Sequence, residues 1–166
     1  MRLNLKKDKQ TFPKEQTHLL PVLLRSWWGI HFAKCCKPVP GDQVVGFISR
    51  GRGVIVHTAD CPHVQTLESE RLIAVNWNNE ESKPFPAQIC IMGRNAKGLL
   101  AGISMALVQQ AVNIDSLEVS STVDGRSQMN FTVEVRDAAH LYKTIDKLRA
   151  VENVTEVRRG TSIADD

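Results

Sequence analysis

The apolar residues of positions 87–135 decide the fold, and this stretch reads AQICIMGRNAKGLLAGISMALVQQAVNIDSLEVSSTVDGRSQMNFTVEV. Apolar side chains alternate over residues 87–92, which predicts a strand that is buried on at least one face. Residues 95–98, Asn-Ala-Lys-Gly, then interrupt the alternation. Over residues 99–111 the apolar side chains return at helical spacing, so one amphipathic helix is expected there.

Two further alternating runs follow this helix, at residues 114–121 and 128–135. Between them stands Asp124-Gly125, a dipeptide that favours tight hairpin turns. Alternation on both sides of such a turn is typical of two antiparallel strands. The stretch therefore predicts the order strand, helix, strand, strand.

The residues after this hairpin complete the order of elements. Asp137 is a good N-cap for a second helix, whose apolar positions continue on one face as far as Leu148. A pair of apolar residues ending at Val157 indicates a short final strand. The predicted order βαββαβ is that of the ferredoxin-like fold, an antiparallel sheet with both helices on one face. We assign this α+β domain to residues 87–160 and leave residues 161–166 as a tail.

The N-terminal half is predicted to form a separate, smaller domain. Residues 78–86, NNEESKPFP, show no apolar period and contain two prolines, so they are interpreted as a linker. Before the linker, residues 29–77 offer shorter elements: a hairpin of residues 44–48 with 53–57, and a third strand over residues 72–77. This domain has so few apolar residues that something besides burial is expected to stabilise it.

Composition excludes several classes of protein. At 166 residues the chain has room for one or two small domains rather than a large multidomain enzyme. The net charge of +3 is too small to mark the whole chain as a nucleic-acid binder, and the basic excess lies in the N-terminal half, including an unassigned segment at residues 1–28. No apolar stretch reaches the roughly 20 residues of a membrane span, and no signal peptide is recognised. We therefore expect a cytoplasmic protein without membrane contact, with reduced cysteines.

Three of the four cysteines and one histidine form the most informative pattern of the chain. Cys35 and Cys36 are adjacent, and His57 is followed four residues later by Cys61. Thiolate and imidazole are common zinc ligands, and three cysteines with one histidine would complete a closed, structural site. His63 is a rival to His57, since it lies two residues past Cys61. Spacing alone leaves two other interpretations open, a pair of buried free thiols and a redox-active thiol.

Catalysis by these residues is a further, weaker hypothesis. Cys36 could act as a nucleophile with His57 as its base, but a residue to orient that base is not evident. The sequence contains no nucleophile elbow, no phosphate-binding loop and no zinc-protease motif. The fourth cysteine, Cys90, stands in an apolar strand and is expected in the core.

Two segments of the N-terminal half, FAKCCKPVPGD at residues 32–42 and GVIVHTADCP at residues 53–62, strongly resemble the zinc-finger domain of the RelA/SpoT family. Members of that family synthesise and hydrolyse guanosine tetra- and pentaphosphate, (p)ppGpp, in the stringent response. NAKGLL at residues 95–100 and VNI at residues 112–114 resemble the ACT domain of the same family. The resemblance implies a small zinc-stabilised β-hairpin domain followed by a ferredoxin-like ACT domain, with zinc held by the cysteines and histidine above.

The resemblance also implies a surface for RNA. Similar zinc-finger domains contact ribosomal RNA and tRNA, so we expect the ribosome to be a partner. The candidate contact residues are the basic side chains that flank the predicted metal site in the sequence, Lys34, Lys37, Arg50 and Arg52. Aromatic residues make up only 5% of the chain, which favours recognition of shape and phosphate charge over base stacking.

A second binding site is implied in the ACT domain. ACT domains commonly bind a small effector, such as an amino acid, where the first helix begins, and they meet a partner subunit there. The free amide groups of a helix N-terminus suit a carboxylate. In this chain the corresponding residues are Asn95, Lys97, Gly98 and Leu99.

The expected function is therefore regulatory and not catalytic, because the residues show no counterpart of the family's synthetase and hydrolase domains. We expect a region that senses the ribosome, its tRNA or an effector and controls (p)ppGpp synthesis and hydrolysis by catalytic domains elsewhere. A full-length family member is a possible partner. The alternative is a free-standing ACT-type dimer that binds an amino acid, and a melting shift with branched-chain amino acids would favour it.

Overall fold

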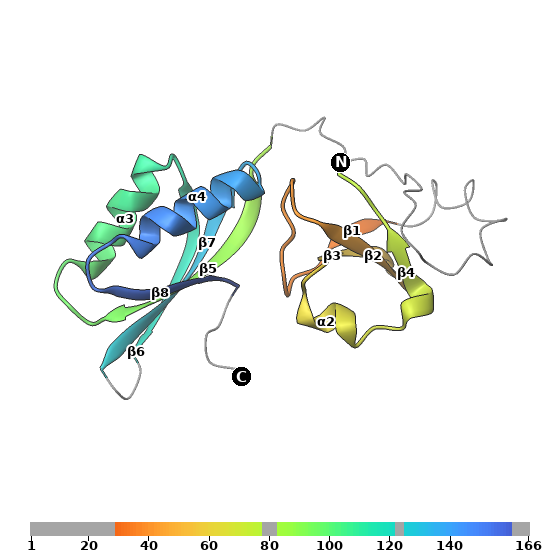
Figure 1. Ribbon diagram of the computed structural model, residues 1–166, viewed down its shortest axis with the longest axis horizontal. Helices are drawn as coiled ribbons and strands as arrows, with labels where there is room; N and C mark the ends of the chain where they lie inside the picture. The colour runs from red at the N-terminus through yellow and green to blue at the C-terminus, as the bar shows by residue number, and fades with distance from the viewer. Residues whose placement is uncertain (1–28, 78–82, 122–124, 161–166) are drawn as a thin grey trace. The chain divides into compact units, whose positions relative to one another are not determined.

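The structure is a computed structural model, and it describes residues 29–77, 83–121 and 125–160. The chain folds as two compact units (Figure 1). The basic segment at residues 1–28, the tail at 161–166 and the linker positions 78–82 lie outside the described residues. Among the described residues no helix is long and apolar enough to cross a membrane.

The first unit is built on a four-stranded sheet with the strand order β1-β3-β2-β4. Its strands are β1 (Ile30–Phe32), β2 (Val44–Ser49), β3 (Gly53–Thr58) and β4 (Leu72–Ala74), and a short helix α2 (Pro62–Gln65) and a 3-10 turn η1 (Ser69–Arg71) lie between β3 and β4. The predicted hairpin is present, because β2 and β3 pair antiparallel over their full length. Its core consists of three buried valines, Val54, Val56 and Val75, with Phe32, Val44 and Ile73 packed against them.

Two strands of this unit differ from the sequence prediction. β1, which was not predicted, pairs in parallel with β3 and is only three residues long, too short for a two-residue period to stand out. β4 was expected over residues 72–77 but ends at Ala74. The apolar residues beyond it serve packing instead: Val75 is buried, and Trp77 stacks on Phe32 with 5.5 Å between ring centroids.

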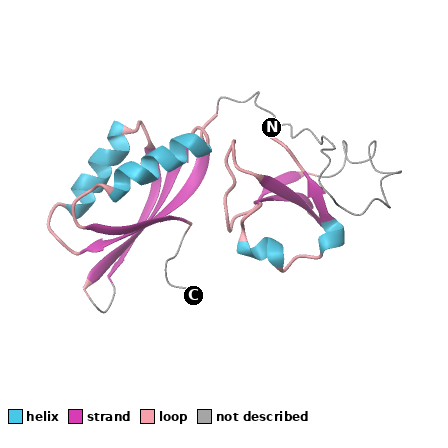
Figure 2. Cartoon of the chain, in the orientation of Figure 1, coloured by secondary structure: helices cyan, strands magenta, loops and turns pink. Residues whose placement is uncertain are grey.

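The second unit has the predicted βαββαβ order, and Figure 2 shows both of its helices on one face of the sheet. The elements are β5 (Phe85–Arg94), α3 (Leu99–Gln109), β6 (Asn113–Ser121), β7 (Arg126–Val135), α4 (Ala138–Arg149) and β8 (Val154–Arg159). All neighbours in the order β6-β7-β5-β8 are antiparallel. Asp137 caps α4 as predicted, since its side chain accepts the backbone N–H of His140 at 2.7 Å. The ferredoxin-like fold expected from the sequence is confirmed.

β5 begins inside the segment that was interpreted as a linker. Phe85 is buried and Pro86 pairs with Glu134 of β7. A proline is tolerated here because β8 pairs only with positions from Ile89 to Gly93, so β5 is an edge at Pro86. The two prolines of this segment therefore misled the prediction of where the strand starts.

The second unit also includes Val39–Asp42, which the sequence places inside the cysteine-containing half. Val39 is fully buried, and the carbonyl oxygen of Pro40 accepts the backbone N–H of Ala138 at 2.8 Å. The Asp42 carboxylate accepts two hydrogen bonds from the Arg159 guanidinium, at 2.8 and 2.6 Å. These contacts make the segment part of the second unit.

Candidate metal centre

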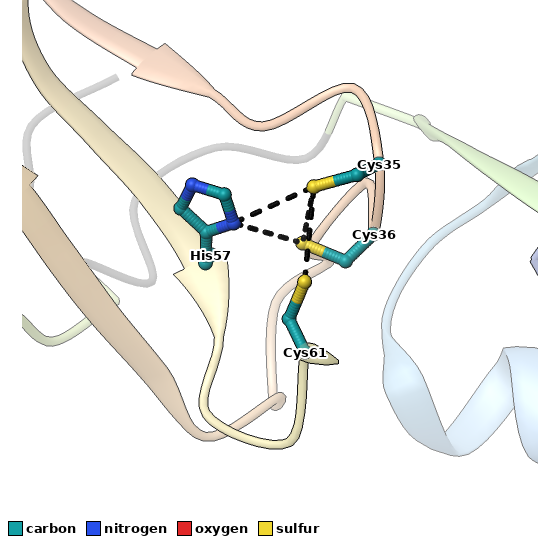
Figure 3. Close-up of side chains that lie close together, drawn as sticks. All are labelled: Cys35, Cys36, His57 and Cys61. Carbon is teal, nitrogen blue, oxygen red and sulfur yellow. Dashed lines mark hydrogen bonds between the residues drawn. The ribbon is translucent and has the colours of Figure 1, made fainter. Parts of the chain in front are cut away.

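Three loops and strand ends of the first unit bring together Cys35, Cys36, His57 and Cys61 (Figure 3). The backbone N–H of Ala33 donates to the carbonyl oxygen of Val56 at 2.9 Å, which extends the pairing of β1 with β3 and carries the following cysteines to the end of β3. His57 lies near that end of β3. A turn closed by the N–H of Cys61 on the carbonyl oxygen of Thr58, at 3.1 Å, then returns Cys61 to the same place.

The four side chains converge on one point. Cys35 Sγ lies 3.5 Å from His57 Nδ1, 3.7 Å from Cys61 Sγ and 4.0 Å from Cys36 Sγ. Cys36 Sγ lies 3.8 Å from the same His57 nitrogen. All four ligand atoms lie within 4.8 Å of one another. These residues could therefore hold a single metal ion, as the sequence predicted.

The protonation of these groups follows from their burial. Burial is the largest cause of the raised pKa of Cys36, which reaches about 12, and it also raises the pKa of Cys35. Burial lowers the pKa of His57, and the nearby His63 adds to this effect. Without a metal, the two thiols are therefore protonated and the imidazole is neutral near pH 7. A metal ion that binds here must displace the thiol protons, while the histidine is ready to donate its lone pair.

One backbone group supports the site and was not found from the sequence. The N–H of Thr58 points at Cys36 Sγ, with 3.4 Å between nitrogen and sulfur. An N–H that faces a thiolate offsets part of its charge and fixes its direction. No side-chain motif signals such a contact, because it depends on the path of the backbone after His57.

The structure also tests the other interpretations of the cysteines and of His63. Cys35 is exposed, so a pair of buried free thiols does not describe the site. His63 Nδ1 lies 3.8 Å from Cys61 Sγ, but the histidine that belongs to the cluster of ligand atoms is His57. Cys90 is fully buried in β5, which confirms that it belongs to the core.

The basic residues proposed for RNA contact fall into two places rather than one. Lys34 is exposed and immediately precedes the paired cysteines, and Lys37, which is half-buried, follows them. Arg50 and Arg52 are exposed in the turn between β2 and β3. His57 is four residues further along β3 than Gly53, which is about 13 Å in an extended strand. The arginines therefore lie away from the metal site in space, although in the sequence they stand between its two pairs of residues.

The candidate effector residues surround the start of α3. Gly98 is the N-cap and adopts a left-handed conformation, with φ of 88°, and no side chain caps the helix there. Asn95 and Lys97 are exposed, whereas the Leu99 side chain is buried and faces the core. A ligand at this turn could reach the backbone of Leu99 but not its side chain.

Comparison with known protein families gives two matches. Residues 26–78 match the RelA/SpoT RIS domain, and residues 81–159 match the ACT domain. A solved structure, the ACT domain of a GTP pyrophosphokinase from Chlorobium tepidum, is 29% identical, covers 46% of this chain and 97% of its own, and has a TM-score of 0.41.

Curated relatives match both domains together. The bifunctional (p)ppGpp synthase/hydrolase RelA of Mycobacterium tuberculosis is 40% identical over 80% of this chain and 18% of its own length. GTP pyrophosphokinases of Streptomyces coelicolor and Escherichia coli K12 are 38% and 35% identical, over 80% and 78% of this chain. The chain spans less than a fifth of the length of these relatives, in their C-terminal region.

Proposed function

Because the chain belongs to the RelA/SpoT family through its RIS and ACT domains, we propose that it is a zinc-binding regulatory region that senses the ribosome and its tRNA. Its output would be control of (p)ppGpp synthesis and hydrolysis by catalytic domains that it does not itself contain. The observation that carries this proposal is the convergence of three thiols and one imidazole in the first unit.

Zinc is the metal we propose for this site. In a tetrahedron with Zn–S bonds of about 2.3 Å and a Zn–N bond of about 2.0–2.1 Å, neighbouring sulfurs lie about 3.8 Å apart and sulfur and nitrogen about 3.6 Å apart. Four of the six distances here are 3.7 and 4.0 Å for two sulfur pairs and 3.5 and 3.8 Å for two sulfur–nitrogen pairs, and the other two are within 4.8 Å. Four protein ligands leave no position for substrate, so the role of the metal is structural.

Metal analysis tests the zinc proposal directly. Freshly purified, reduced protein is expected to contain one zinc ion per chain. A matched variant, Cys90→Ser, alters a cysteine of the other unit and should keep that content. Less than about 0.2 zinc per chain in both proteins would contradict the proposal, given the tight binding of structural zinc.

We further propose that exposed basic residues of the first unit contact ribosomal RNA. Phosphate contacts release counterions, so the affinity for ribosomes should fall steeply with salt. Because the basic residues occupy two places, two double variants separate them: Arg50→Ala with Arg52→Ala, and Lys34→Ala with Lys37→Ala. Each pair that makes contact should flatten the logarithmic salt dependence by about one unit per residue in a co-sedimentation assay. Unchanged binding by both double variants at all salt concentrations would reject this surface.

The cellular setting follows from the same proposal. A site of three reduced thiols suits a reducing compartment, so we propose that the chain acts in the cytoplasm. We propose a full-length RelA/SpoT protein as one partner of this region. Association should be measurable by co-purification of the tagged chain with such a protein. Failure to co-purify would contradict this proposed partner.

The alternative function, a free-standing ACT dimer that binds an amino acid, is favoured by one observation. Apolar side chains are exposed on the outer face of α3 and on β6, which is an edge strand of its sheet: Leu100, Met105, Val108, Ile114 and Val119. A second copy of the chain would cover this surface. Under this alternative the chain is dimeric and its melting temperature rises with a branched-chain amino acid bound near Gly98.

A further inference from the structure

The redox chemistry of the cysteine cluster is a property that the regulatory proposal does not use. We propose that Cys35 and Cys61 form a reversible disulfide under hydroperoxide stress, which replaces the metal-binding state of the site. This inference deepens the proposed function, since it makes the zinc site of the regulatory region sensitive to oxidants. It rests on the positions of the sulfur atoms, which do not depend on the identity of the metal.

Exposure selects the thiol that reacts first. Cys35 is exposed, whereas Cys36 is half-buried and Cys61 is 4% exposed. A hydroperoxide from solution therefore reaches the sulfur of Cys35 most easily. In addition, Cys36 Sγ accepts the N–H of Thr58, which withdraws electron density from that sulfur. Cys35 is the residue expected to be oxidised.

Geometry selects the second thiol. Cys61 Sγ is 3.7 Å from Cys35 Sγ, and 26 positions in the sequence separate the two residues, so the bond would not need the small ring of an adjacent pair. The sulfur atoms need to approach by roughly 1.7 Å to reach the usual S–S length of about 2.05 Å. Cys36 Sγ is 4.0 Å away, and a bond between adjacent cysteines requires a strained eight-membered ring. Cys61 is therefore the favoured partner.

The reaction balances in two steps. The Cys35 thiol loses its proton to the solvent and its sulfur attacks one oxygen of hydrogen peroxide, so that the O–O bond breaks and a sulfenic acid and a hydroxide ion form. The Cys61 thiolate then attacks the Cys35 sulfur and expels the second hydroxide, which gives the disulfide. Two electrons pass from the two thiolates to the peroxide, and the two hydroxide ions take protons from the solvent to become water.

The consequence for the site is loss of metal affinity. After the disulfide forms, Cys36 and His57 are the only members of the four-residue cluster that can still donate to a metal. Two ligands do not hold a structural zinc ion, which requires four. Reduction by a dithiol would restore all four ligands, so the change is reversible.

The experiment oxidises the reduced, full chain with one equivalent of hydrogen peroxide and then blocks free thiols with N-ethylmaleimide. Zinc release is followed with a chromogenic chelator, and tryptic peptides are analysed without reduction. Cleavage after Lys34, Arg50, Arg52 and Arg71 yields one peptide of residues 35–50 and one of residues 53–71. These two peptides should be found joined, with Cys36 carrying the blocking group and about one zinc ion released per joined pair.

The matched control is Cys90→Ser, which removes the cysteine of β5 and leaves the cluster unchanged. It should give the same joined peptides, and a dithiol should restore zinc binding in both proteins. A bond between Cys35 and Cys36, a bond to Cys90 or between chains, or sulfinic acid at Cys35 without a joined peptide would each overturn the inference. If the protein contains no zinc but still gives the joined peptides, the zinc proposal fails and the disulfide proposal stands.

Discussion

Removal of the metal should unfold the first unit and leave the second unit intact. The first unit has three buried valines in its core, and each contributes about 1.5–3 kcal/mol at most. A structural zinc ion contributes about 10–16 kcal/mol of apparent binding free energy at neutral pH, which is comparable to the entire stability of an ordinary domain, about 5–15 kcal/mol. The binding free energy of the metal is therefore larger than the contribution of the valine core, so the core alone cannot keep the unit folded.

Hydrogen–deuterium exchange read by mass spectrometry measures this difference within one sample. After chelation, amides of β2 and β3 should lose most of their protection, because these strands hold His57 and pack the valines. Amides of β5 and β7 should exchange as before, since that sheet has its own core. Zinc added back should restore protection in β2 and β3. If the amides of Val54 and Val56 stay protected in metal-free protein, the metal does not stabilise the unit as argued.

Other parts of the structure give further expectations. Phe131→Ala should lower the free energy of unfolding of the second unit by about 3–5 kcal/mol in a denaturant titration, without changing zinc content, because Phe131 is 1% exposed in that core. Zinc affinity should fall as pH falls, since burial raises the pKa of Cys35 and Cys36 and protons then compete with the metal for these two sulfurs. Calorimetry in buffers of different ionisation enthalpy should show that protons are released when zinc binds. A zinc affinity that stays the same from pH 8 to pH 6 would contradict thiolate ligation. The isolated chain should neither make nor hydrolyse (p)ppGpp, and turnover that survives removal of full-length enzyme would refute this.

The second unit was predictable from the sequence because its elements are long enough to show their periods. β7 alternates over ten residues and its buried positions are every second residue, as the sheet geometry requires. The start of β5 was placed too late, since Pro86 is normally excluded from central strands. Whether a proline lies at an unpaired position depends on how far β8 extends, and no local pattern contains that information.

The first unit was harder to predict because its strands are short and its apolar core is small. The four residues that could hold a metal ion were predicted from residue type, since thiols and imidazoles at such positions have few other uses in a reduced protein. β1 and the N–H of Thr58 escaped prediction, because a three-residue strand has no visible period and a backbone donor has no sequence signature. The separation of Arg50 and Arg52 from the metal site also escaped prediction. It arises because the arginines precede β3 and His57 lies near the end of this extended strand.

Electrostatics indicates which basic residues are available for phosphate. A zinc ion held by three thiolates and a neutral imidazole would carry one net negative charge, in a partly buried place. The N–H of Thr58 faces this charge, and Lys34, the exposed residue next to Cys35, is the nearest basic residue in the sequence. Arg50 and Arg52 lie in the turn before β3, at the opposite end of that strand from His57 and about 13 Å away along it, so the charge of the metal site does not occupy them. For this reason the arginine variants should flatten the salt dependence of ribosome binding more than the lysine variants, and the reverse order would show that the metal site itself faces the RNA.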